Sequence, residues 1–599
     1  MPHARLFVST VMGMLAGFLS AHAEAVNFPG EWFLRPPTPE RIQLLISAAP
    51  GKGWEPLSVG LYQGALGAYE HGQLDVAESW CYVAAWMEML GQTQADAGRR
   101  WLETVFKARL LNPNVNQPAI GALSSEPLAK LVPPDLLAWL LGDRAFSAAF
   151  FDQLSADDYL PQVLAILRDL HATDPRRFAT YNQLALAIAL VYDSPPPPNW
   201  PHAQVTPQAL PRQLPRPVDA FNFFVDSDQH GATLHKLATL TVSELKFAVD
   251  LSASFPELLW AQRQIKFTVA QLPKTYDLVR YRNDRLEAQQ YVWPSASYEL
   301  ARIYSEGGIC VDQAYFASQA GKARGVPTLL FRGEGQDGRH AWFGYLGSGQ
   351  RWFLDAGRYA EQHYATGVAF DPQTWADLSD HDLQFLSEGF RKLPPYQQSR
   401  QYELFAKLYL RLGKGKEAAA AARKSVNAER RNLAGWKTLL AAVDGTDFRT
   451  REILLREAAL ALQRYPDLNA FFVRALAESM RGRGEGSAAD FEERLIARKN
   501  QGTRTDLATD QAAEMVTRVL NDTPLPEQLR VFRLALRQYG EDSGIDFYDR
   551  VVVPFVSALV SQQHRGDAKI ALAEARLALK PAMISQLDKE IKALAESLK

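Results

Sequence analysis

The chain has 599 residues, of which 47% are hydrophobic and 22% charged, the balance of ordinary soluble globular proteins. The chain has 65 basic and 67 acidic residues, which leave a formal net charge of −2. The basic residues form no continuous block, and both features argue against nucleic-acid binding. A chain of this length has room for about three or four domains of ~150 residues each. It contains only two cysteines, so a framework of several disulfides is excluded.

The first segment has the pattern of an export signal. Arg5 lies in a short basic region, an apolar stretch runs from Leu6 to Leu19, and Ala21 and Ala23 supply small residues before a cleavage position. This apolar stretch is shorter than the ~20 residues that a membrane span requires. We therefore expect a signal peptide at residues 1–23, cleavage after Ala23, and a secreted or periplasmic protein with no membrane span after signal removal.

Residues 24–193 are expected to form an N-terminal helical domain. Gly72, Ala77 and Ala84 stand at spacings typical of a helix-turn-helix repeat, in which glycine opens the turn and small residues let two helices approach. Cys81 lies within this pattern and is interpreted as a packing residue. The segment 194–217 follows, and its many prolines predict an extended linker between domains.

Residues 218–394 combine further helical segments with a mixed region. A helix is expected to follow Cys310 and to end near Gly325, which suits the position after a helix C-terminus. Three strands are expected at PTLLFRG, HAWFGYL and RWFLDAGRY, because these stretches are dense in aromatic and β-branched residues and are separated by glycine-bearing turns.

Residues 395–599 are expected to be a C-terminal helical domain. Tyr409, Gly413, Ala418 and Trp436 stand at offsets that resemble those of a tetratricopeptide repeat, although Ser425 replaces a preferred alanine. Stacked helical hairpins usually present a concave binding surface, so a protein partner on these repeats is a hypothesis. A helical bundle without a binding role is the alternative.

Cys310 stands directly after Gly307-Gly308-Ile309, at the expected start of a helix. The positive end of a helix dipole favours a thiolate and lowers the pKa of a thiol, and the thiolate is the nucleophilic form. This placement indicates a reactive cysteine. A single disulfide between Cys81 and Cys310 is the competing interpretation.

His340 and Asp355 follow Cys310 at the start of one expected strand and near the end of the next. If residues 347–348 form a two-residue type II′ turn, the strands pair so that His340 and Asp355 face each other. Their Cβ atoms would then lie ~4.5–5.5 Å apart, close enough for a hydrogen bond between carboxylate and imidazole. A slip of one residue would place them on opposite faces. The sequence thus predicts a nucleophile, a base and an orienting acid in this order.

The three segments GGICVDQAYFASQAGKARGVP, GRHAWFGYL and RWFLDAGRY resemble the three motifs of the transglutaminase-like superfamily. The matched part covers about residues 285–360. The resemblance implies a papain-like α+β core, with Cys310 as nucleophile, His340 as general base and acid, and Asp355 as its orienting partner. It also implies acyl transfer through a thioester, with no metal or other cofactor in the chemistry.

Members of this superfamily usually supply a second oxyanion donor from a side chain upstream of the cysteine. Gln290, Tyr291 and Trp293 are the candidates here, with aromatic packing as the alternative role. Asp312 is interpreted as a local cap or a solvent-exposed residue. The triplet Asp380-His381-Asp382 has metal-ligand chemistry, but a solvated turn is the preferred interpretation, and no metal site is predicted.

Taken together, the sequence predicts an exported α+β protein that is mostly α-helical, with a central transglutaminase-like domain flanked by helical repeat regions. Its expected activity is transamidation or hydrolysis of amide bonds in proteins or peptides through a thioester at Cys310. Two alternatives stay open. One is a non-catalytic scaffold that binds partners through its helical repeats, and the other is a cysteine peptidase or amidase that acts on cell-wall peptides.

Overall fold

The computed structural model describes residues 25–102, 124–445, 448–500, 502–520, 523–541 and 543–599. The predicted signal peptide, residues 1–23, lies outside these ranges. Helices dominate the described chain, and its strands form a five-stranded antiparallel sheet, so the expected mostly helical fold with a small β component is confirmed. Within these ranges, no helix combines the length and apolar character that crossing a bilayer requires.

The N-terminal region consists of helices stacked around a large apolar core. They are α1 (Pro39–Lys52), α2 (Trp54–Glu70), α3 (Leu74–Gly91), α4 (Gln94–Trp101), α6 (Pro134–Gly142), α7 (Arg144–Gln153), α8 (Leu160–Thr173), α9 (Pro175–Thr180) and α10 (Asn182–Val191). The predicted helix-turn-helix is α2–α3, and Gly72 adopts φ 78° in its turn. Cys81 is buried at 3% exposure as a free thiol, which confirms its packing role and excludes the disulfide to Cys310.

The proline-rich segment 194–217 packs on the central region over part of its length. Trp200 is buried against Trp375, with ring centroids 5.4 Å apart. His202 Nε2 lies 3.0 Å from the Tyr298 hydroxyl oxygen, and burial lowers the pKa of this histidine to about 3. The connection between the N-terminal region and the central region is thus anchored by aromatic side chains.

The central region places helices around the sheet. The helices are α11 (Pro217–Gln229), α12 (Val242–Val249), α13 (Phe255–Gln264), α14 (Asn283–Glu287), α15 (Leu300–Glu306), α16 (Cys310–Ala323) and α17 (Asp380–Leu386). The strands are β1 (Thr328–Glu334), β2 (Arg339–Leu346), β3 (Trp352–Ala356), β4 (Val368–Phe370) and β5 (Asp377–Ser379). Their order in the sheet is β3-β2-β1-β4-β5. The helix after Cys310 and the first three strands appear where the sequence predicted them.

Helix α16 packs against β1 and β2 through an apolar layer. Ala314 and Ala317 on the helix share a buried cluster with Ala341 and Phe343 of β2, and their small size lets helix and sheet approach closely. At the end of α16, Gly325 adopts φ 65° and releases the chain into β1. The apolar layer and the short turn therefore fix the position of α16 relative to the sheet.

The C-terminal region is an array of antiparallel helices: α18 (Pro394–Arg411), α19 (Gly415–Ala428), α20 (Leu433–Ala442), α21 (Phe448–Ala461), α22 (Pro466–Arg481), α23 (Gly486–Asn500), α24 (Thr505–Leu520), α25 (Leu525–Tyr539), α26 (Gly544–Phe547), α27 (Val553–Ser561), α28 (Arg565–Leu579) and α29 (Gln586–Ser597). The unexpected Ser425 is buried and lies 3.0 Å from the Ser399 hydroxyl, beside the Asn432 amide. A polar cluster thus replaces the alanine contact of a typical repeat.

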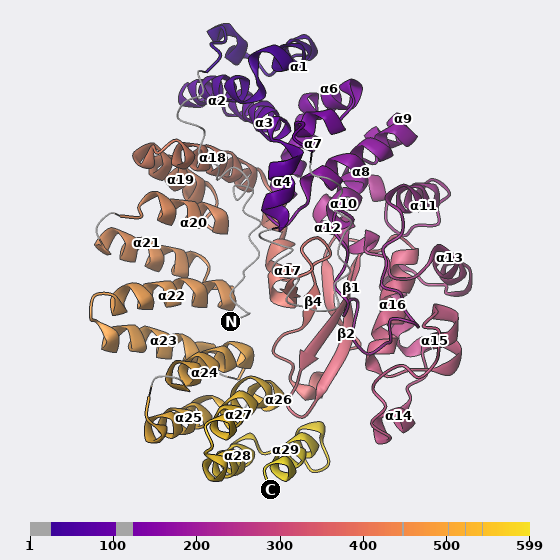
Figure 1. Ribbon diagram of the computed structural model, residues 1–599, viewed down its shortest axis with the longest axis vertical. Coiled ribbons are helices and arrows are strands. Elements are labelled where there is room, and N and C mark those ends of the chain that lie inside the picture. The colour runs from indigo at the N-terminus through magenta and orange to yellow at the C-terminus, as the bar shows by residue number, and fades with distance from the viewer. Residues whose placement is uncertain (1–24, 103–123, 446–447, 501, 521–522, 542) are drawn as a thin grey trace.

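The array curves from the N-terminal helices back to the sheet (Figure 1). At its start, Tyr69 of α2 stacks on Phe405 of α18 at 4.4 Å. At its end, α26 and α29 contact the turn between β1 and β2. Between these points, Phe385 of α17 packs against Tyr465 with ring centroids 4.7 Å apart. The three regions therefore form a closed circuit of contacts.

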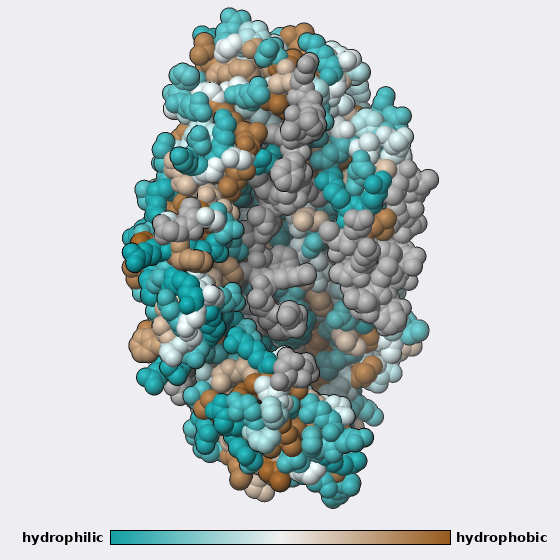
Figure 2. Space-filling model, turned by 60° about the vertical axis from the view of Figure 1, so that its left-hand side comes forward, coloured by the Kyte–Doolittle hydropathy of each residue, from teal (hydrophilic) through white to brown (hydrophobic). Residues whose placement is uncertain are grey.

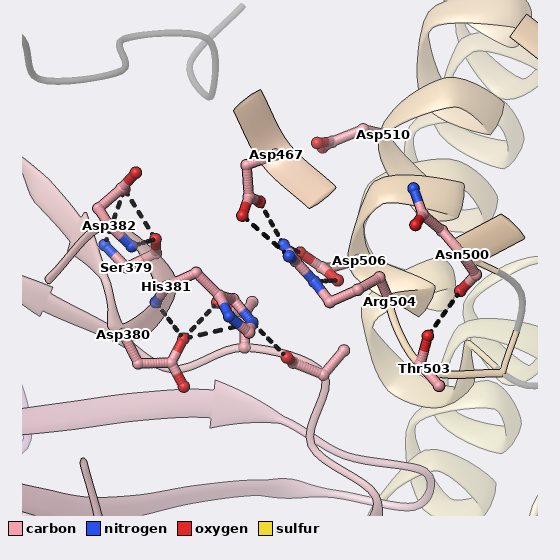
Figure 3. A network of polar contacts seen from close by, with 12 residues as sticks. Ser379, Asp380, His381, Asp382, Asp467, Asn500, Thr503, Arg504, Asp506 and Asp510 are labelled. Carbon is pink, nitrogen blue, oxygen red and sulfur yellow. Dashed lines mark hydrogen bonds and ion pairs between the residues drawn. The ribbon is translucent and has the colours of Figure 1, made fainter. Parts of the chain in front are cut away.

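Polar contacts accompany the apolar ones along this circuit. The Arg504 guanidinium lies between the carboxylates of Asp467 and Asp506, on the side of the array that faces His381 of α17 (Figure 3). The face in Figure 2, which brings the array forward, is largely hydrophilic with separate hydrophobic patches. Exposed apolar residues of α21 and α23 include Ile453, Leu460 and Phe491.

Candidate functional site

Cys310 is the first residue of α16, and the backbone before it is fixed by glycines. Gly307 adopts φ 79°, and a Cβ atom there would lie 2.4 Å from the Arg280 carbonyl oxygen. A Cβ atom on Gly308 would lie 2.3 Å from the Cβ atom of Asp312. Position 307 needs glycine because of its left-handed backbone, and a side chain at either position would collide with a neighbouring residue.

Asp312 caps the helix that begins with Cys310. Its carboxylate accepts hydrogen bonds from the Ile309 backbone N–H at 2.8 Å and from the Tyr298 hydroxyl at 2.7 Å. It also forms an ion pair with Arg285 at 2.7 Å, with both side chains almost fully buried. The predicted capping role is confirmed, whereas solvent exposure is wrong because Asp312 is at 0% exposure.

The Cys310 thiol is half-buried beside the start of β2. Burial raises the pKa of this thiol to about 11, and the nearby backbone of Ala341 acts in the opposite direction. The expected lowering of the thiol pKa by the helix terminus is therefore outweighed by desolvation. In this arrangement the Cys310 thiol is neutral at about pH 7, so it could act as a nucleophile only if a base took its proton.

His340 is the second residue of β2, next to Ala341. Its Nε2 lies 2.7 Å from the Gly357 carbonyl oxygen. Because a carbonyl oxygen only accepts, Nε2 carries the hydrogen and the neutral ring leaves Nδ1 as a proton acceptor. Burial lowers the pKa of His340 below its usual value, although the Gly357 carbonyl opposes this shift.

Asp355 does not face His340. The β2–β3 hairpin pairs Leu346 with Trp352, whereas the prediction paired Leu346 with Gly349. Its loop closes through the Gly347 N–H and the Arg351 carbonyl at 2.8 Å, and Gln350 adopts φ 54°, as in three-residue loops with one left-handed residue. The predicted two-residue turn and its register are therefore wrong.

A further irregularity lies between Phe343 and Tyr345, and beyond it Phe343 pairs with Ala356. The shift leaves Asp355 exposed at the edge strand and brings Tyr359 beside the imidazole, with ring centroids 4.2 Å apart. In the part of the chain that the structure describes, the Gly357 carbonyl occupies the place beside His340 that the sequence assigned to the Asp355 carboxylate.

Four tyrosines surround the thiol, and sequence reasoning missed them. Burial first, and the nearby Cys310 second, raise the pKa values of Tyr276, Tyr281, Tyr359 and Tyr364. Tyr359 and Tyr364 also stack on His340, and the Tyr276 ring lies edge-on to it at 6.4 Å. Thiol and imidazole thus border the same aromatic cluster. No hydrogen bond joins them among the described residues.

Tyr276 ties this cluster to the backbone. Its hydroxyl donates to the Ala341 carbonyl oxygen at 2.9 Å and lies 3.4 Å from the Cys310 carbonyl oxygen. Tyr281 is placed by a parallel bridge to Gly308, two residues before Cys310. No periodic pattern in residues 276–281 marks either tyrosine. Only the fold brings them to Cys310.

The three oxyanion candidates lie around the Arg285–Asp312 pair. Gln290 and Tyr291 are exposed, and their carbonyl oxygens accept hydrogen bonds from Arg285, both at 3.3 Å. Trp293 is buried, and its indole N–H donates to the Ser297 carbonyl oxygen at 2.9 Å. Trp293 is therefore a packing residue, and the backbone of Gln290 and Tyr291 supports Arg285, the partner of the capping Asp312.

No metal cluster appears at these positions. Within the described ranges, no group of three or more histidine, cysteine, aspartate or glutamate side chains is arranged to hold a metal ion. Asp380 accepts hydrogen bonds from Thr366 and from the His381 backbone N–H, and His381 Nε2 lies 2.9 Å from the Ala365 carbonyl oxygen. The triplet therefore caps α17 and bonds to neighbouring groups of the protein.

A scan against protein-family models and a search of curated proteins found no match to this chain.

Proposed function

We propose that this protein is a cysteine acyltransferase or amide hydrolase of the transglutaminase-like type. The observation that carries the proposal is the convergence at the start of β2. Cys310 lies at the N-terminus of α16 and packs against the buried cluster that contains Ala341, and the adjacent His340 presents Nδ1 as an acceptor because Nε2 is bound to Gly357. A helix that begins with the cysteine and packs on an antiparallel sheet also supports a papain-like core.

In the proposed reaction, Cys310 attacks the carbonyl carbon of an amide. The thiol proton moves to His340 Nδ1, a sulfur–carbon bond forms, and the carbonyl π electrons move to oxygen. When the intermediate collapses, the carbon–nitrogen bond breaks and the imidazolium returns the proton to the leaving amine. A thioester remains. Water or a second amine then attacks the thioester carbon while His340 takes its proton. The carbon–sulfur bond breaks and the proton passes to the Cys310 sulfur, which gives hydrolysis or transamidation.

The role of Asp355 changes in this proposal. Since the Gly357 carbonyl bonds Nε2, a backbone group orients the imidazole and no carboxylate is needed for that task. A carbonyl stabilises an imidazolium less than a carboxylate does. The base should therefore be weaker than in a Cys–His–Asp triad, which agrees with the lowered pKa of His340.

One observation favours the scaffold alternative. A thiol whose pKa is raised to about 11 is almost fully protonated at about pH 7, so it is unreactive without a base. The two functions differ in one property: a catalytic thiol reacts through His340, whereas a structural thiol reacts only as its own ionisation allows.

The test is the pH dependence of iodoacetamide labelling of Cys310, followed by intact mass, in wild type and His340→Gln. For a catalytic site, the wild-type rate should rise with a midpoint below 6.5, the ordinary histidine value, and level off, because neutral His340 is the base. In His340→Gln the rate at about pH 7 should drop at least tenfold. Cys81 is an internal control, since it is buried and its pKa is raised to about 12. Identical pH profiles in wild type and His340→Gln would contradict the catalytic function and favour the scaffold function.

A further inference from the structure

The turn between β1 and β2 is bound on two sides by the end of the helical array. The Gly335 carbonyl accepts the Ile545 N–H at 3.2 Å, and the Asp337 carbonyl accepts the Leu587 N–H at 3.1 Å. The Asp337 carboxylate accepts the Ala582 N–H at 2.8 Å. These donors come from α26, from the loop before α29 and from α29 itself, more than 200 residues away in sequence.

Close packing makes this contact specific. Gly544 opens α26 with φ 52°, and a Cβ atom there would lie 2.5 Å from the Gln336 carbonyl oxygen and 2.6 Å from its Cα atom. Any side chain at position 544 would therefore collide with the backbone of the turn. The backbone of the array and the backbone of the hairpin are therefore in direct contact at this point.

Arg339 forms the centre of the contact. Its guanidinium donates three hydrogen bonds to the Asp549 carboxylate at 2.6, 2.7 and 3.2 Å and two to the Glu590 carboxylate at 2.6 and 3.1 Å. Its backbone N–H donates to the Gln586 side-chain oxygen at 3.0 Å. Both the side chain and the main chain of one residue are thus held by the C-terminal helices.

Arg339 is also the residue directly before His340. In β2, Arg339 and Ala341 point to one side of the strand and His340 to the other. The Tyr276 hydroxyl donates to the Ala341 carbonyl oxygen at 2.9 Å, and the Ala341 side chain belongs to the buried cluster against which Cys310 packs. The proposed base therefore lies between one residue fixed by the nucleophile's surroundings and one fixed by the array.

We propose that the C-terminal helices complete the active site by positioning His340, with Arg339 as the positioning residue and Asp549 and Glu590 as its holders. This inference rests on the proposed function. Catalytic groups must be held within about 0.5 Å of their working positions, and a displacement of about 1 Å can reduce a rate 10²-fold. Backbone pairing with β1 holds Arg339 and His340, and the array adds contacts to the side chain and the N–H of Arg339.

The experiment uses the full-length chain and the variants Arg339→Gln, Arg339→Lys and Asp549→Asn/Glu590→Gln. Arg533→Gln is the matched control, because Arg533 pairs with Glu574 at 2.9 Å within the same array and at similar exposure but away from the hairpin. Hydrogen–deuterium exchange of residues 335–346 reports the order of the hairpin. The pH profile of iodoacetamide labelling at Cys310 reports the action of His340.

We expect Arg339→Gln and the double variant to speed exchange in the hairpin and to slow His340-dependent labelling about tenfold. Arg339→Lys should recover part of the rate, since an ammonium group holds two carboxylates less well than a guanidinium. Arg533→Gln should match wild type in both measurements. Thermal unfolding checks that each variant is folded.

Faster exchange with an unchanged labelling profile would overturn the positioning role, and so would unchanged exchange in Arg339→Gln. The proposed function fails in a different way. If His340→Gln labels like the wild type, His340 is not a base, whatever Arg339 does to the exchange of the hairpin.

Discussion

At Cys310, two physical effects of opposite sign act on one thiol. The end of a helix and a nearby backbone N–H favour the thiolate by about 0.3–1 kcal/mol, whereas burial can shift a pKa by several units. Burial prevails here and raises the pKa to about 11. The sequence located the cysteine at the start of a helix correctly. It could not reveal the burial, because Tyr276 and Tyr364 reach the thiol from segments on either side of the motif.

The first prediction concerns Asp355. Because this side chain is exposed and His340 Nε2 is bound to Gly357, Asp355→Asn should change the rate of Cys310 labelling by less than about twofold. The wild-type pH profile should also be preserved. A loss comparable to that of His340→Gln would mean that Asp355 turns toward the imidazole in the working enzyme, and it would restore the acid role that the sequence suggested.

The second prediction concerns the pKa of His340. Burial lowers it, and the Tyr359 ring, stacked at 4.2 Å, provides part of that burial. In Tyr359→Ala the pKa should rise toward 6.5, so the imidazole is protonated at a higher pH and the acid side of the labelling profile moves upward. Tyr359→Phe keeps the ring and is the control. NMR titration of the His340 ring measures the shift, and equal pKa values in the two variants would contradict the role of Tyr359.

At the scale of elements, the three strands were predictable but their register was not. The density of aromatic and β-branched residues between glycine-bearing turns identified β1, β2 and β3, since this pattern depends only on local sequence. Pairing depends on loop conformation, and GSGQ allows both a two-residue turn and the three-residue loop with Gln350 in the left-handed region. The longer loop shifts the pairing by three residues and the irregularity between Phe343 and Tyr345 adds one more, so Asp355 lies away from His340. The short strands β4 and β5 carry too few residues for a pattern.

The third prediction concerns the cap of α16. Arg285 and Asp312 form a buried pair, so Arg285→Met leaves a carboxylate without its cation in an apolar setting. The local stability of α16 should fall by about 3 kcal/mol or more, measured by native-state hydrogen exchange. Adding Asp312→Asn should recover part of the loss, because the amide is neutral. Arg282→Met, which removes the exposed pair with Asp284, should have little effect. Equal losses in Arg285→Met and Arg282→Met would contradict the capping role.

For the whole molecule, composition and local pattern predicted helical regions on both sides of a small sheet, and the described chain has them. They gave no indication that the regions close into a circuit (Figure 1). That arrangement depends on single contacts between residues far apart in sequence, such as Arg339 with Asp549 and Tyr69 with Phe405. Such pairs carry no periodic signal. The helical array, which the sequence offered as a surface for a partner, uses both of its ends to bind the rest of its own chain.

The circuit leads to the last prediction, which concerns its N-terminal junction. Arg411 of α18 is 4% exposed, pairs with Glu88 of α3 at 2.9 Å and lies over the Tyr62 ring. In Arg411→Met the Glu88 carboxylate loses its cation, at a cost of about 3 kcal/mol. Because both helices share the contact, hydrogen exchange should become faster in α3 as well as in α18. Arg411→Met/Glu88→Gln should restore part of the protection in both helices. Faster exchange confined to α18 and α19 would show that the N-terminal helices and the array are separate cooperative units that only touch.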